Sequence, residues 1–110
     1  MAYKKDIQKE LQKRVLVMDG AMGSLIQEYK LKEENYRGEK LKNATHDQLG
    51  NNDILSLTHP EIIAEIHGKY LDAGADIILT NTFNANRISQ ADYNTQDLVY
   101  EMNKASAEIA

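Results

Sequence analysis

The fold of this chain is decided by the stretch Arg14-Val-Leu-Val-Met-Asp-Gly-Ala-Met-Gly-Ser24, in which an apolar run breaks abruptly into a glycine-containing loop. Residues 15–18 contain no polar side chain, which is typical of a strand that is buried on both faces of a sheet. Asp19 and Gly20 then indicate a sharp turn. Apolar residues spaced three and four apart follow over residues 22–29, so the stretch predicts a strand, a loop and a helix.

The same arrangement recurs at Ala75-Asp-Ile-Ile-Leu-Thr-Asn-Thr-Phe-Asn-Ala-Asn86. Apolar residues 77–79 give way to the polar residues Thr80, Asn81 and Thr82, and a helical pattern comes later. In parallel α/β folds the binding site lies at the carboxyl ends of the strands. We therefore expect the two loops to lie together at the working edge of a parallel sheet.

Further helices are predicted around these two units. Ile7 and Leu11 are four residues apart, enough for a short amphipathic helix over residues 6–13. Thr58-His-Pro-Glu61 begins a clear helix, because proline suits the first helical position and glutamate favours the dipole there. Gly74 should end that helix in a left-handed conformation. A last helix begins near Thr95 and reaches the end of the sequence with no stop signal.

Two βα units are all that the sequence predicts with clarity, and a parallel sheet of two strands cannot cover its own edges. We therefore expect residues 1–110 to be the N-terminal part of a larger α/β pattern, or two copies to complete each other. The polar residues 30–52 form a long connection, with one helical turn near residues 33–36.

The composition excludes several classes of function. The net charge is −4 and no lysine or arginine cluster is present, which argues against a nucleic-acid partner. No apolar run is long enough to span a membrane. Residues 1–13 are charged rather than signal-like, so we expect a cytoplasmic location. Cysteine is absent, so these residues offer no disulfide, thiol nucleophile or thiolate metal site.

The loop that begins at Asp19 has two interpretations. It could bind an amino acid, because Asp19 could hold an ammonium group, while Gly20 and the helix start that follows favour the approach of a carboxylate. It could instead be a tight turn in which Asp19 and Gly20 only satisfy backbone geometry. Likewise, residues 80–84 either orient a polar ligand or cap a strand end, and Gly50-Asn-Asn-Asp53 is a rim loop or, more simply, a turn.

The three histidines, His46, His59 and His67, do not share the spacing of metal ligands, and we interpret each as structural or solvated. No nucleophile–histidine–carboxylate arrangement or carboxylate pair can be recognised, so we predict no catalytic residue and no metal site within the chain.

Several strings in a fixed order resemble the start of the homocysteine-binding domain in the homocysteine S-methyltransferase family, in its cobalamin-dependent methionine synthase branch. These strings are Val15-Leu-Val-Met-Asp-Gly-Ala-Met-Gly-Ser24, Tyr36-Arg-Gly-Glu39, Gly50-Asn-Asn-Asp-Ile-Leu55, His59-Pro-Glu61, Ala73-Gly-Ala-Asp-Ile-Ile78 and Thr80-Asn-Thr-Phe83. The resemblance extends from about Leu11 to the end of the sequence.

The resemblance implies a (β/α)8 TIM barrel, of which this chain would be the first two βα units, and the transfer of a methyl group from methylcobalamin to homocysteine. It places Asp19 and Gly20 beside the amino-acid group of homocysteine, Ser24 near that loop, and Thr80 and Asn81 at the end of the second strand. It also implies zinc held by three cysteines in later strands, with cobalamin and folate modules elsewhere. The chain has none of those cysteines, so we expect it to bind no cofactor and to be inactive alone.

Two alternatives stay open. The parent enzyme could use betaine or S-methylmethionine as a direct methyl donor without cobalamin, although Tyr36-Arg-Gly-Glu39 and Gly50-Asn-Asn-Asp53 look more like the cobalamin-dependent branch. The chain could also be a stand-alone binding module that associates with itself through its unfinished sheet. In either case we expect the isolated chain to self-associate.

Overall fold

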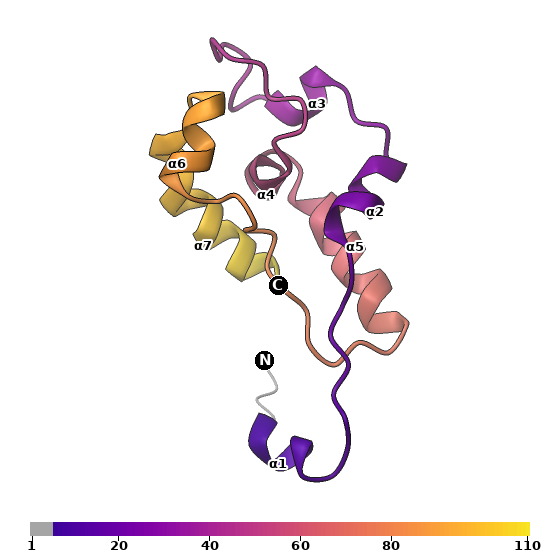
Figure 1. Cartoon of the computed structure of the whole chain (residues 1–110). Helices are drawn as coiled ribbons and strands as arrows, with labels where there is room; N and C mark the ends of the chain where they lie inside the picture. Colours follow the sequence, from indigo (N-terminus) through magenta and orange to yellow (C-terminus); the bar gives the residue numbers. More distant parts are fainter. Residues whose placement is uncertain (1–5) are drawn as a thin grey trace.

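Two extended segments, residues 15–20 and 75–80, cross the lower half of the molecule in the view of Figure 1, where the sequence predicts strands. A single parallel bridge joins Met18 to Ile77. The amide of Asp19 donates to the carbonyl of Ile77 at 2.9 Å, and the amide of Asp76 donates to the carbonyl of Val17 at 2.7 Å. The segments are therefore parallel neighbours, but their pairing is too short for either to form a regular strand. We call them the extended pair.

The computed structural model describes residues 6–110, so the first five residues of the charged N-terminal segment predicted over 1–13 lie outside the described part. The helices, in chain order, are α1 (Ile7–Leu11), α2 (Met22–Glu28), α3 (Glu33–Arg37), α4 (Leu55–Thr58), α5 (Pro60–Asp72), α6 (Arg87–Gln90) and α7 (Val99–Ile109), with 3-10 turns η1 (Asn52–Ile54), η2 (Ala91–Tyr93) and η3 (Gln96–Leu98). Within residues 6–110, no helix combines the length and the apolar character needed to cross a bilayer.

Helix α5 follows the predicted bounds closely. It begins at Pro60 and ends at Asp72, and Gly74 has a φ of +108°, as expected for a glycine that ends a helix. The predicted last helix is present as well, although it starts with the 3-10 turn η3 before α7. The stretch 53–57, which the sequence pattern leaves unassigned, is helical as η1 and α4.

Helices α2 to α7 form what we call the helical body. In Figure 1 it occupies the upper part of the molecule, while α1 lies apart at the far end of the extended pair. The molecule is accordingly long, with principal extents of 51 × 26 × 25 Å. The core of the body is a cluster of fully buried side chains from η1, α4, α5 and α7, namely Ile54, Leu55, Ile63, Ile66 and Met102.

The extended pair is less buried than the sequence predicts. Residues 15–18 were expected to be covered on both faces, yet Val15 is 83% exposed and Val17, Met18 and Leu79 are each more than half exposed. Among the described residues, the bridge between Met18 and Ile77 is the only strand-like pairing that either member makes. The expectation of burial therefore fails for this chain as it stands.

The two members of the pair are held together at their beginning by an ion pair. The guanidinium of Arg14 donates two hydrogen bonds to the carboxylate of Asp76, at 2.9 and 2.8 Å. The same carboxylate accepts the amide of Val17 at 2.9 Å. This bidentate contact fixes the alignment of the segments at the end opposite to the Asp19 loop.

Candidate substrate site

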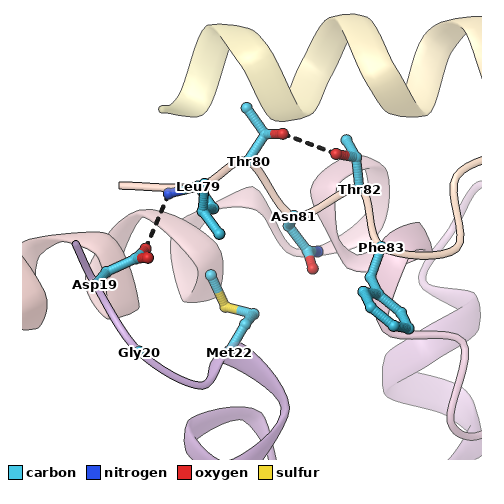
Figure 2. Close-up of a pocket in the computed structure, with 8 residues that line it drawn as sticks. All are labelled: Asp19, Gly20, Met22, Leu79, Thr80, Asn81, Thr82 and Phe83. Atoms are coloured by element: carbon cyan, nitrogen blue, oxygen red, sulfur yellow. Dashed lines mark hydrogen bonds between the residues drawn. The ribbon is translucent and has the colours of Figure 1, made fainter. Parts of the chain in front are cut away.

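A cavity of about 360 Å³ opens where the extended pair meets the helical body. Figure 2 shows the residues that line it, which come from the two loops that the sequence singled out: Asp19, Gly20, Met22, Leu79, Thr80, Asn81, Thr82 and Phe83. The structure thus brings together four of the five predicted site residues, although they lie some 60 positions apart in the chain. The fifth, Ser24, is exposed on α2 and does not line this cavity.

Asp19 is fixed by one of its two carboxylate oxygens. Oδ2 accepts the backbone N–H of Leu79 at 3.0 Å, across the extended pair (Figure 2). Oδ1 is buried and has no hydrogen-bond partner within residues 6–110. A buried carboxylate oxygen without a partner is costly, so Asp19 is suited to accept a hydrogen bond from a cationic group in the cavity.

The glycine loop is held by helix α5. The hydroxyl of Tyr70 donates to the carbonyl of Ala21 at 2.8 Å. A Cβ atom at Gly20 would lie 3.0 Å from that hydroxyl oxygen. Glycine suits this position because a side chain here would push the tyrosine aside by a few tenths of an ångström, and the hydrogen bond from Tyr70 ties the turn beside Asp19 to α5.

The second loop, residues 80–83, contains one residue that is buried against the helical body and three that remain at the cavity. Asn81 is buried, and its Nδ2 donates to the carbonyl of Asn52 at 2.9 Å and to the hydroxyl of Ser56 at 3.3 Å. The hydroxyls of Thr80 and Thr82 are 2.7 Å apart and share a hydrogen bond. Phe83 is 94% exposed. Asn81 thus anchors the loop to the helical body, while Thr80, Thr82 and Phe83 remain available at the cavity.

A second cavity of about 240 Å³ adjoins the first and shares Met22, Asn81 and Phe83 with it. Its wall includes Asp53, whose Oδ2 accepts the backbone N–H of Asn84 at 2.8 Å. Burial raises the pKa of Asp53 above its ordinary value, and the hydrogen bond from Asn84 only partly opposes this effect. The interpretation of residues 50–53 as a plain turn missed this buried carboxylate. The sequence signal that could have revealed it is the charge of Asp53 in the mostly apolar stretch 53–57.

The described residues do not provide a zinc site. Within residues 6–110, no group of three histidine, cysteine, aspartate or glutamate side chains is placed to hold a metal ion, and the whole sequence lacks cysteine. The thiolate ligands that the sequence resemblance implies therefore do not come from this chain.

The cavity therefore offers one carboxylate, two hydroxyls, backbone groups and an apolar wall, and these groups suit the binding of a small ligand that carries an ammonium group. A comparison with protein families identifies the family of the chain. The family model described as Homocysteine S-methyltransferase matches residues 16–110. The chain belongs to this family of methyltransferases.

Proposed function

We propose that this chain supplies the first homocysteine-binding loops of a methyltransferase, in which Asp19 receives the ammonium group of the substrate. The observation that carries the proposal is the geometry of Asp19 in a chain of this family: Oδ2 is tied to Leu79, while Oδ1 is buried and unpartnered within residues 6–110. An ammonium group would satisfy that oxygen with a charge-assisted hydrogen bond.

The other contacts follow from the walls of the cavity. Gly20 lets the ligand approach the backbone, and Thr80 offers a hydroxyl, while Asn81 holds the second loop in place. Ser24 is not part of this contact set, because it is exposed on α2 and outside the lining of the cavity.

We further propose that the extended pair represents the first two strands of a (β/α)8 barrel and that the parent enzyme is a cytoplasmic, cobalamin-dependent methionine synthase. Support comes from the ordered strings Tyr36-Arg-Gly-Glu39 and Gly50-Asn-Asn-Asp53. Zinc and cobalamin would be held by residues outside these 110. A thiol with an ordinary pKa is mostly neutral at pH 7, and this chain has no cysteine ligand to change that, so we expect no methyl transfer by the chain alone.

The experiment is steady-state kinetics of a homocysteine methyltransferase that contains these residues, with Asp19→Asn. The Michaelis constant for homocysteine should rise about tenfold or more, since one charge-assisted hydrogen bond is lost, while the zinc content stays unchanged. Asp72→Asn is the control, because Asp72 is exposed at the end of α5. An unaltered Michaelis constant would show that Asp19 only shapes the turn.

One observation favours the alternative of a self-associating module. The extended pair exposes Val15, Val17, Met18 and Leu79 on adjacent segments, and burial of such surface against a second copy is worth about 25 cal/mol per Å². Light scattering over a dilution series should then show a dimer or larger species that loses mass when Val17→Lys is introduced. A monomer at all concentrations would exclude this function.

A further inference from the structure

Helix α7 contacts the second loop of the candidate site, although the proposed function gives this helix no role. Figure 2 shows the helix, in pale yellow, running along the loop that contains Thr80 and Thr82. Two side chains of α7, those of Asn103 and Ser106, donate hydrogen bonds to the backbone of this part of the chain. Because they are three residues apart, they lie on one face of the helix. That face is therefore directed at the loop.

Ser106 makes the contact within the loop. This residue is fully buried, and its hydroxyl shares one proton between the hydroxyl oxygen of Ser56 at 2.7 Å and the backbone carbonyl of Asn81 at 3.2 Å. The hydroxyl of Ser56 also accepts Nδ2 of Asn81 at 3.3 Å. Asn81 is thus held through both its backbone and its side chain by a pair of hydroxyls, one from α7 and one from α4.

Asn103 makes the contact just beyond the loop. Its Nδ2 donates to the carbonyl of Ala85 at 2.8 Å. The same nitrogen donates to the carbonyl of Val99, one turn earlier in α7, at 2.8 Å. The second bond fixes the side chain on its own helix, so the position of Ala85 is tied to that of α7.

Residue 84, between these two contacts, is held by other elements. The N–H of Asn84 donates to Oδ2 of Asp53 at 2.8 Å, and its carbonyl accepts Nε2 of Gln90 at 3.0 Å. A loop has no helix or sheet ladder of its own to pair its backbone groups, so side chains from other elements take that part. Helix α7 is the element that contacts the stretch 81–85 at both of its ends.

We propose that Asn103 and Ser106 are positioning residues, a clamp on α7 that fixes the second loop and so holds Thr80 and Thr82 at the cavity. The hydroxyls of these threonines bond to each other, and the amide of Thr82 donates to the carbonyl of Thr80, so their place depends on the loop as a whole. A loop that is ordered before its ligand arrives loses less conformational entropy on binding. The inference rests on the proposed function, in which Thr80 offers a hydroxyl to homocysteine.

The first test is amide hydrogen exchange in the 110-residue chain. The amides of Thr82 and Ala85 report on the loop, because each donates to a carbonyl within it. Asn103→Ala should quicken exchange at both about fivefold, as expected for the loss of one hydrogen bond, and leave the amide of Ile66 in α5 unchanged. Lys104→Ala is the matched control at an exposed neighbour on α7 and should change none of them.

Ser106→Ala should quicken exchange at the same two loop amides about tenfold, because the lost hydroxyl is buried. Met102→Ala, one turn earlier in α7, is the control for packing, since Met102 belongs to the apolar core; it should quicken exchange in α5 and in the loop alike. Unaltered loop amides in Asn103→Ala overturn the inference, even if Ser106→Ala does not fold. Equal acceleration of α5 and the loop in Asn103→Ala overturns it as well.

The second test is the affinity of the same chain for homocysteine. Asn103→Ala should weaken binding about threefold to fivefold, Asn103→Gln should recover part of the loss because it keeps an amide donor, and Lys104→Ala should bind as the wild type does. Unchanged affinity in Asn103→Ala, with a quickened loop, would overturn the claim that the clamp serves binding. A wild-type chain that binds no homocysteine would count against the proposed function, whereas the exchange data would still decide whether α7 fixes the loop.

Discussion

The helical body and the extended pair differ in how well each covers its own apolar residues. In the body, Ile63 on α5 and Met102 on α7 are fully buried, although they lie almost 40 residues apart in the sequence. In the extended pair, equally apolar residues such as Val15 and Val17 remain exposed. Helices satisfy their backbone groups internally, whereas a strand depends on neighbours on both sides.

This difference explains where the candidate site lies. The cavity forms at the boundary, with Asp19 from the extended pair on one side and Asn81 anchored to the helical body on the other. The body gives the loops a fixed support. The pair brings the carboxylate of Asp19 to that support through a single bridge and the Arg14–Asp76 contact.

The largest expected effect is in the core of the body. Ile63→Ala should lower the free energy of unfolding by about 3 kcal/mol, because it leaves a cavity at a side chain with 0% exposure. Val15→Ala in the extended pair should change it by less than about 0.5 kcal/mol. Urea unfolding followed by circular dichroism measures both. Equal effects at the two positions would contradict the contrast between the regions.

The next effect concerns a buried group of three amide side chains and one hydroxyl, which we call the amide cluster. Its members are Gln48, Asn51, Gln90 and Thr95. The side chains of Asn51 and Gln90 exchange two hydrogen bonds, both at 3.0 Å, and Thr95 donates to Gln90 at 2.6 Å. Gln90→Leu should cost about 2 kcal/mol, since it leaves buried polar groups unpaired. Gln27→Leu on the exposed face of α2 is the control in the same urea titration and should be close to neutral.

A smaller effect should appear as a dependence on pH. The carboxylate of Glu33 accepts the amides of Gln48 and Leu49 and pairs with Arg37. Burial opposes these contacts, but together they hold the pKa of Glu33 below its ordinary value of 4.5.

Because the folded-state pKa is lowered, Glu33 stabilises the chain above the unfolded-state pKa, and this stabilisation is lost as the pH falls through the folded-state pKa. Glu33→Gln should therefore be less stable than the wild type at pH 7 and lose less stability on acidification below about pH 4.5. Unfolding curves at several pH values test this. Glu34→Gln, at an exposed position, should keep the wild-type slope.

The smallest effect on global stability is expected at the ion pair of the extended pair. Asp76→Asn removes the bidentate contact with Arg14 and weakens the acceptor of the Val17 amide. Hydrogen exchange should quicken at the amides of Val17 and Ile77 and stay unchanged within α7. Uniform exchange throughout the chain would mean that the pair and the body unfold as one unit.

Local signals in the sequence were sufficient to predict α5 and, in outline, α1, α2, α3 and α7, but they left α4 unassigned and did not predict α6. Pro60 restricts the backbone at the first residue of α5, and Gly74 allows the positive φ that follows the end of this helix. The meeting of Asp19 with Thr80 also followed from a general rule about strand ends. The exposure of Val15 could not be predicted in this way. A run of apolar residues indicates that a strand is buried, but it does not say which neighbouring segments are present to bury it.

The amide cluster and the burial of His67 on α5 could not be predicted for a different reason. Asn51 and Gln90 are joined by side-chain hydrogen bonds across 39 residues, and no periodicity connects them. The sequence interpretation of His67 as structural or solvated did not separate a buried ring from a surface one. Its burial depends on how α5 is rotated against the loop at Asp19.

The reciprocal amide pair of Asn51 and Gln90 has an evolutionary consequence. Each side chain is at once the donor and the acceptor of the other, so replacing either alone removes two buried hydrogen bonds at once. A second change at the other position has no reciprocal bond left to lose. Across relatives of this chain the two positions should therefore change together or not at all, and a relative that retains only one of the two amides should have gained a new polar neighbour for it.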